Sequence, residues 1–158
     1  MVVYTNQTKE DLFKLEDNFA LGVNFDGEMD KGIALEFRNR WPDFYRCYNK
    51  FCKEHDRMGA GDTYAYPIPG PTPGTNRWLV CLGIVDRGSD VVKPEYLKTC
   101  VTGTTLSLRT ISQKSMIFPG ICDDFKCDLS WEEIKELFET ADTEGMTFTV
   151  KENSPQKP

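Results

Sequence analysis

Two segments of the sequence combine glycines with carboxylates where the chain is predicted to leave a strand and enter a helix. They are residues 24–32 (NFDGEMDKG) and residues 119–130 (PGICDDFKCDLS). In open α/β sheets, ligands bind beyond the carboxyl ends of the strands, where such loops lead into helix N-termini. Glycines such as Gly27 and Gly32 let backbone N–H groups turn toward an anion. The pattern favours an anion site, although it also occurs in plain strand-to-helix connections.

The second segment carries three carboxylates that could act as a general base, namely Asp123, Asp124 and Asp128. A carboxylate within hydrogen-bond reach of a water molecule can activate that water for attack. Two adjacent carboxylates also repel a phosphate, unless they point away or become protonated. In the first segment, Asp30 and Lys31 either narrow the cleft, act on the ligand, or form an exposed pair without a role.

The elements that must position these loops alternate between strands and helices. Residues 19–24 and 77–85 are nearly continuous apolar runs, as expected for strands covered on both faces. A capping box of Ser130 and Glu133 marks the start of one helix. The predicted strands are 1–6, 19–24, 63–67, 77–85, 115–121 and 146–150, and the predicted helices cover 31–40, 42–51 and 94–104 and follow Ser130. This alternation predicts one layered α/β domain with a largely parallel sheet.

The composition is that of a folded globule with more acidic than basic residues. The chain has 158 residues, of which 39% are hydrophobic, and its formal net charge is −6. This charge argues against duplex nucleic acid as the main partner, because phosphate contacts need clustered Lys and Arg. It leaves room for a nucleotide-sized anion held by a few backbone N–H groups. Oligomeric state is left open.

Membrane, metal and disulfide functions are disfavoured by the same sequence. No apolar run approaches the roughly 20 residues that span a bilayer, and the N-terminus lacks a secretory signal, so a cytoplasmic location without a membrane partner is expected. The six cysteines include no C-x-x-C pair, and His55 is the only histidine. We therefore expect no metal site and no cofactor, and free thiols rather than a disulfide framework.

Residues 19–42 (FALGVNFDGEMDKGIALEFRNRWP) resemble the first ligand loop of macro domains. The likeness is closest to the branch of ADP-ribose-1''-phosphate phosphatases and terminal ADP-ribose glycohydrolases, whose loop reads roughly V-N-x-x-G-x-M-G-x-G-I-A. The matching residues are Asn24, Gly27, Met29, Gly32, Ile33 and Ala34. Weaker matches at residues 10–13, 61–62, 78–88, 117–131 and 146–150 keep the family's order. The resemblance implies a three-layer α/β/α macro domain over residues 1–151, with a mixed, mostly parallel sheet of about six strands, and a disordered tail at 152–158.

The resemblance also implies roles for individual residues. Asp11 would accept a hydrogen bond from the adenine amino group, Asn24 would hold the distal ribose, and the backbone at Gly32 would wrap the distal ribose and diphosphate. The alternatives are that Asp11 is a helix-start carboxylate and that Asn24 bonds its own loop. The full ligand-binding prediction is Asp11, Leu12, Asn24, Gly27, Met29, Lys31, Gly32, Ile33, Gly120, Ile121, Cys122 and Phe125. The catalytic candidates are Asn24, Asp30, Asp123, Asp124 and Asp128.

The second loop departs from the family pattern. The family's Gly-x-Gly is replaced by residues 122–124 (CDD), and one residue is inserted before Trp131. Residues 85–88 (VDRG) hold no lysine where glycohydrolase relatives use one, which disfavours a covalent lysine mechanism. The leading hypothesis is hydrolysis of ADP-ribose-1''-phosphate, or release of ADP-ribose from a modified macromolecule. The alternatives are a non-catalytic ADP-ribose reader and an interaction domain that has lost the ligand.

Overall fold

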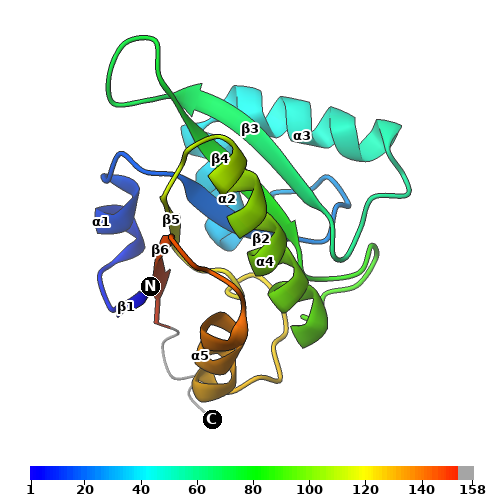
Figure 1. Cartoon of the computed structure of the whole chain (residues 1–158). Helices are drawn as coiled ribbons and strands as arrows, with labels where there is room; N and C mark the ends of the chain where they lie inside the picture. Colours follow the sequence, from blue (N-terminus) through cyan, green and yellow to red (C-terminus); the bar gives the residue numbers. More distant parts are fainter. Residues whose placement is uncertain (153–158) are drawn as a thin grey trace.

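The computed structural model describes residues 1–152, so all but the first residue of the tail predicted at 152–158 lies outside the described residues. The elements alternate much as the sequence predicts (Figure 1). In chain order they are β1 (Val2–Thr5), α1 (Lys9–Phe13), β2 (Phe19–Val23), α2 (Gly32–Arg40), α3 (Pro42–Glu54), β3 (Thr63–Pro69), β4 (Asn76–Gly83), α4 (Pro94–Thr110), β5 (Ser115–Phe118), α5 (Trp131–Thr140) and β6 (Thr147–Lys151).

The strands form one sheet in the order β1-β6-β5-β2-β4-β3. Every neighbouring pair is parallel except β3 and β4, which run antiparallel at one edge. The predicted mixed, mostly parallel sheet of about six strands is therefore confirmed. β2 lies inside the sheet, and its first residue, Phe19, is in register with Leu79 on β4 and Ile117 on β5.

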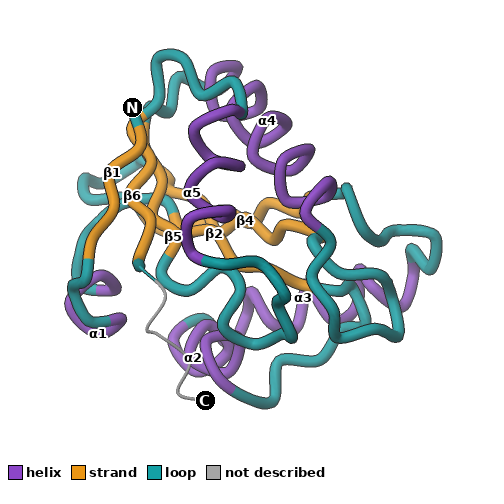
Figure 2. The backbone as a smooth tube through the Cα atoms, turned by 90° about the horizontal axis from the view of Figure 1, so that it is seen from below, coloured by secondary structure: helices purple, strands orange, loops and turns teal. Residues whose placement is uncertain are grey.

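Helices cover both faces of the sheet, which confirms the three-layer architecture. Alternate residues of a strand point to opposite faces. On β2, Phe19, Leu21 and Val23 join the core beneath α1, α2 and α3, whereas Ala20 joins the core beneath α4 and α5. Figure 2 shows α4 and α5 on one side of the strands and the other helices on the opposite side. All five residues of β2 are buried, as predicted for a strand covered on both faces.

Local signals account for where several helices begin. Pro42 occupies the first turn of α3, where its missing N–H is not needed. The predicted capping box is confirmed, because the Ser130 hydroxyl accepts from the Glu133 N–H and the Glu133 carboxylate accepts from the Ser130 N–H. The sequence patterns did not predict α1, a single short turn whose start is capped by the Thr8 hydroxyl.

One buried amide joins three strands at the end opposite the cleft described below. The Asn18 side chain is 2% exposed and lies just before β2. Its Nδ2 donates to the Ser115 carbonyl at 2.9 Å and to Gln113 Oε1 at 3.0 Å, and its Oδ1 accepts from the Trp78 N–H at 2.7 Å. Because these partners lie on or beside β4 and β5, Asn18 aligns the starts of the three central strands.

No helix within residues 1–152 is both long enough and apolar enough to cross a membrane. Across the same residues, the side chains form no group of three or more potential metal ligands. All six cysteines are free thiols, and Cys52, Cys81, Cys100 and Cys122 are buried.

Candidate functional site

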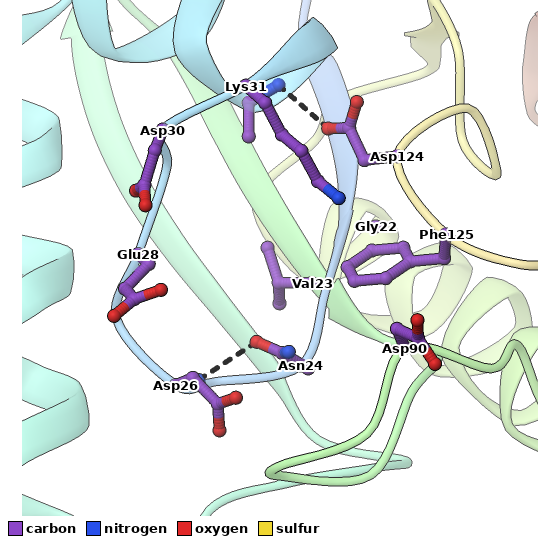
Figure 3. Close-up of a pocket in the computed structure, with 11 residues that line it drawn as sticks. Gly22, Val23, Asn24, Asp26, Glu28, Asp30, Lys31, Asp90, Asp124 and Phe125 are labelled. Atoms are coloured by element: carbon purple, nitrogen blue, oxygen red, sulfur yellow. Dashed lines mark hydrogen bonds between the residues drawn. The ribbon is translucent and has the colours of Figure 1, made fainter.

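A cleft of about 220 Å³ opens at the carboxyl end of β2 (Figure 3). This is where an α/β sheet is expected to bind a ligand. The structure brings Asn24, Asp30, Lys31, Asp124 and Phe125 together here, all of which the sequence predicts as site residues. The full lining is Gly22, Val23, Asn24, Asp26, Glu28, Asp30, Lys31, Ala34, Asp90, Asp124 and Phe125.

A shallower hollow of about 420 Å³ adjoins the cleft, and we call it the outer hollow. It is lined by Lys31, Asp90, Asp123, Asp124, Phe125, Lys126, Cys127 and Asp128. Lys31, Asp90, Asp124 and Phe125 line both spaces. Two of the predicted catalytic carboxylates, Asp123 and Asp128, line only the outer hollow. They are therefore separated from Asn24 by the residues that both spaces share.

Asn24 holds the first loop to the loop that follows β4. Its Oδ1 accepts from the Asp26 N–H at 3.0 Å, and its Nδ2 donates to the Ser89 carbonyl at 3.1 Å. The Asp26 carboxylate in turn accepts from the Gly88 N–H, at 2.9 and 3.1 Å to its two oxygens. Asn24 thus lines the cleft and also bonds its own loop, while its contact with the distal ribose stays a prediction.

Two other residues predicted on this loop lie behind the cleft. Met29 is 1% exposed and packs in the core beneath α2 and α3. Gly27 has a φ of +94°, and its carbonyl accepts from Asn49 Nδ2 on α3 at 3.0 Å. Neither residue is among those that line the cleft. The structure therefore gives both a part in shaping the loop.

The start of α2 is occupied by a carboxylate from the second loop. Asp124 Oδ1 accepts from the Ile33 N–H at 3.0 Å, and Asp124 Oδ2 accepts from the Ala34 N–H at 2.9 Å. The Lys31 side chain, at the cap position, makes no capping bond. Burial raises the pKa of Asp124, and the hydrogen bonds from Ala34 and Ile33 oppose this rise.

Gly32 lies directly beside the Asp124 carboxylate and leaves room for it. Its φ is +58°, a region that L residues with a side chain avoid. A Cβ at this position would lie 1.9 Å from Asp124 Oδ1. A side chain at residue 32 would therefore displace the carboxylate packed against it, a contact that no local pattern predicts because Asp124 lies 92 residues further along the chain.

The second loop packs tightly against β2. Ile121 and Cys122 are buried, with exposed fractions of 3% and 4%. A Cβ on Gly22 would lie 2.3 Å from the Ile121 carbonyl oxygen, so only glycine allows the loop to approach the strand this closely. A Cβ on Gly120 would likewise lie 2.5 Å from Asp123 Oδ2. None of the predicted residues Gly120, Ile121 and Cys122 lines the cleft, and they form the layer that supports Asp124 and Phe125.

The Cys122 and Cys127 thiols influence each other's ionisation within this loop. The interaction with Cys122 lowers the pKa of Cys127 to about 7, and partial burial opposes this shift. The interaction with Cys127, together with burial, raises the pKa of Cys122. Cys127 lines the outer hollow, so its thiol lies at the mouth of the site. The sequence predicted Cys122 as a ligand-binding residue and did not single out Cys127 at the site.

The predicted adenine contacts lie on α1 and are not brought to the cleft. The Asp11 side chain is 60% exposed, and its carboxylate lies 3.7 Å from Lys14 Nζ. Leu12 is fully buried, and its N–H donates to the Thr8 carbonyl. Thr8 also accepts from the Asp11 N–H through its hydroxyl. Asp11 is a first-turn carboxylate of α1, and its contact with adenine stays a prediction.

The loop after β4 contributes a residue that the sequence analysis did not name. Asp90 lines both spaces, and its carboxylate lies 3.5 Å from Lys126 Nζ. Its carbonyl also accepts from the Lys126 N–H at 2.7 Å. The position of this loop, after a central parallel strand, was the available signal. Asp90 thus connects a third loop to the site.

Arg87, the basic residue in the stretch where relatives carry a lysine, points away from the cleft. Its guanidinium donates to the carbonyls of Cys52, His55 and Met58, at and beyond the C-terminus of α3. Unpaired carbonyls at a helix end attract such cations. Lys31 is the only lysine or arginine among the described residues that line the cleft. Figure 3 shows its side chain extending on the side of Asp124 and Phe125.

Comparison with known proteins identifies the fold. No protein-family model matches the chain, and no curated protein matches it either. Among solved structures, it resembles the macrodomain of Thermus aquaticus DarG (22% identity, TM-score 0.77), with 97% of this chain and 99% of that chain covered. It also resembles the macrodomain of Mycobacterium tuberculosis DarG (20% identity, TM-score 0.78), with 98% and 99% covered.

A third similar structure is Thermosipho africanus DarTG in complex with ADP-ribose, at 17% identity and a TM-score of 0.73. The match covers 90% of this chain but 40% of that longer chain. These likenesses extend over nearly the whole chain. The macrodomain fold expected from the first ligand loop is therefore confirmed.

Proposed function

We propose that this chain binds ADP-ribose in the cleft at the carboxyl end of β2. The observation that carries the proposal is the joint placement of Asn24, Lys31 and the start of α2 around one cleft in a macrodomain fold. The similar structure of Thermosipho africanus DarTG was solved with ADP-ribose, which supports the choice of ligand. We place this role in the cytoplasm, as expected from the sequence.

In the proposed complex the ligand spans both spaces. The inner cleft alone, at about 220 Å³, is smaller than the roughly 300–1,000 Å³ of ordinary ligand pockets. With the outer hollow it offers an extended site past Lys31 and Phe125. Asn24 would contact the distal ribose, Lys31 would neutralise a phosphate, and the Phe125 ring would form an apolar wall.

Hydrolysis of an ADP-ribose derivative is the second part of the proposal. Two carboxylates at the cleft, those of Glu28 and Asp30, form no hydrogen bond or ion pair within residues 1–152, and this favours hydrolysis. Of these two, Asp30 is the one that the sequence predicts as catalytic. Such a group can accept a proton from a water molecule that attacks the anomeric carbon or its phosphate. Asp30 lines the inner cleft together with Asn24, the proposed contact of the distal ribose, whereas Asp123 and Asp128 line only the outer hollow.

The proposed substrates are ADP-ribose-1''-phosphate or a macromolecule that carries ADP-ribose. A covalent lysine route is not proposed, because residues 85–88 hold no lysine and Arg87 points toward α3. A reader without catalytic activity is the alternative. This alternative is favoured by Asp124, a catalytic candidate whose two carboxylate oxygens already accept hydrogen bonds at the start of α2 and are not free to act as a base.

Calorimetry with ADP-ribose and a turnover assay with both substrate types test the proposal. We expect heat of binding for ADP-ribose, and product release that is lost in Asp30→Asn while binding is kept. Asp56→Asn, a substitution of an exposed residue outside the cleft, is the matched control and should retain both. Binding without turnover would support the reader. The absence of heat at millimolar ADP-ribose would refute the binding proposal.

A further inference from the structure

The start of α2 already holds an anion that the protein itself supplies. The first turn of a helix leaves backbone N–H groups without partners, and together with the helix dipole they attract a carboxylate or a phosphate. Here the N–H groups of Ile33 and Ala34 donate to the two carboxylate oxygens of Asp124. Ala34 and Asp124 both line the cleft, so this contact lies inside the proposed ligand site.

We propose that Asp124 is an internal competitor for the phosphate of the ligand, and that it sets the affinity of the cleft for anions. The inference rests on the proposed function for the identity of the ligand. The contact between the carboxylate and the helix start stands independently of it. A phosphate cannot accept hydrogen bonds from Ile33 and Ala34 while both N–H groups donate to Asp124. A phosphate beside the Asp124 carboxylate would also be repelled by its negative charge.

The fit of Gly32 supports a built-in contact. The space that a side chain at residue 32 would occupy is filled by Asp124 Oδ1, at 1.9 Å from the Cβ position. The backbone there also has the left-handed φ of +58° that favours glycine. The missing Cβ thus leaves room for a carboxylate from the second loop, while the backbone conformation favours glycine independently.

The outer hollow offers space for the Asp124 side chain when it leaves the start of α2. The residue lines the outer hollow as well as the cleft, and Lys126 lines the same hollow. A side-chain rotation would move the carboxylate from α2 toward that space without moving Ile121 and Cys122, which are packed in the core. The ligand's phosphate would then take over the N–H groups of Ile33 and Ala34.

The test compares the wild-type chain with Asp124→Ala and Asp124→Asn. The probes are ADP-ribose and inorganic pyrophosphate, titrated while the backbone amide signals of Ile33 and Ala34 are followed by NMR. Removing the Asp124 carboxylate from the start of α2 should raise the affinity for both probes by about tenfold. A charge-assisted hydrogen bond changes a binding constant by about this factor. Asp56→Ala, which removes the same charge outside the cleft, should leave both affinities unchanged.

Two separate readouts distinguish the two proposals. If neither the wild type nor the variants bind ADP-ribose, the proposed function fails, while tighter pyrophosphate binding at Ile33 and Ala34 would still support the role of Asp124. Equal pyrophosphate affinity in the wild type and both variants would overturn that role. Asp124→Asn keeps the size of the side chain and so allows the measurement should Asp124→Ala fold poorly.

Discussion

The side-chain nitrogen of Asn24 lies 3.1 Å from the carbonyl oxygen of Ser89 and donates a hydrogen bond to it. This bond joins the loop after β2 to the loop after β4, and both loops reach the cleft, through Asn24 and Asp90 respectively. The Asn24 oxygen is also engaged, by the Asp26 N–H. The residue proposed to contact the distal ribose therefore shapes the site as well.

Asn24→Ala should lower both stability and ligand affinity. The stability loss should be about 1–2 kcal/mol, because the Ser89 carbonyl and the Asp26 N–H lose their partner. The affinity for ADP-ribose should fall by about tenfold or more, for loss of a direct contact. Urea unfolding and calorimetry measure the two effects. Asn39→Ala, at an exposed position on α2, serves as the control, and an Asn24→Ala variant with wild-type affinity would contradict the assignment.

Gly32→Ala should destabilise the chain through two separable effects. The left-handed backbone costs a residue with a Cβ about 1–2 kcal/mol, and the clash with Asp124 Oδ1 adds to this. In the Asp124→Ala background the clash is absent, so the double-mutant cycle should show a coupling of about 1 kcal/mol or more. Gly74→Ala isolates the backbone effect, because Gly74 has a φ of +82° and no heavy atom within 4 Å of its Cβ position. Full additivity would argue against the contact.

The reactivity of Cys127 should rise steeply with pH around neutrality. Its pKa of about 7 makes a substantial fraction of the thiol an anion at neutral pH, and the thiolate is the reactive form. Cys122→Ala removes the interaction that lowers this pKa, so alkylation of Cys127 at pH about 7 should slow by several-fold. Peptide mass spectrometry after brief iodoacetamide treatment gives the rate. Labelling of the exposed Cys47 provides the internal comparison, and an unchanged rate at Cys127 would count against an effect of Cys122 on its pKa.

Asp124→Asn should become more stable relative to the wild type as pH rises from about 4, so the difference in unfolding free energy, Asp124→Asn minus wild type, should increase. Burial raises the folded-state pKa of Asp124, so the folded chain binds this proton more tightly than the unfolded chain does. The stability contributed by that proton is lost as pH rises through the folded-state pKa, whereas asparagine does not titrate. Asp123 raises this pKa further and Lys9 of α1 lowers it, while Lys31 and Asp90 line the same cleft.

Urea unfolding of both proteins over the range from pH about 4 to about 7 measures this trend. Because every other carboxyl is shared by the two chains, their difference isolates residue 124. A difference that stays flat, or that shrinks as pH rises, would show that the folded-state pKa of Asp124 is not raised.

Asn18→Ala should cost about 3 kcal/mol of unfolding free energy, because it leaves the partly buried Trp78 N–H and the Ser115 carbonyl without partners. Asn6→Ala, at an exposed position after β1, should change stability by less than about 0.5 kcal/mol. Chemical denaturation of the two variants checks both values. A small loss at Asn18 would mean that the strand starts are aligned without this side chain.

The sequence predicted the architecture because its signals are local. Continuous apolar runs, the proline at residue 42 and the capping box at Ser130 each act within a few residues, and the strands and helices that they predict are present. β5 ends three residues earlier than predicted, at Phe118, where Pro119 has no N–H to continue the ladder.

The site was predictable only in part, since its decisive contacts join distant segments. The sequence of the first loop predicted Asn24, Asp30 and Lys31 as site residues, and that of the second loop predicted Asp124 and Phe125. All five line the cleft. The pairing of Asp124 with Ile33 and Ala34 depends on how the second loop packs against β2, which no local pattern encodes. Asp90 lies in the loop after β4, for which the sequence had indicated only the absence of a lysine at residues 85–88.

The most direct measurement is amide chemical-shift mapping of the whole chain during titration with ADP-ribose. The account predicts that the largest changes fall on residues 22–34 and 121–126, with α4 on the opposite face of the sheet unaffected. No change at millimolar ADP-ribose, or changes confined to other surfaces, would contradict the claim that the cleft at the end of β2 is the binding site.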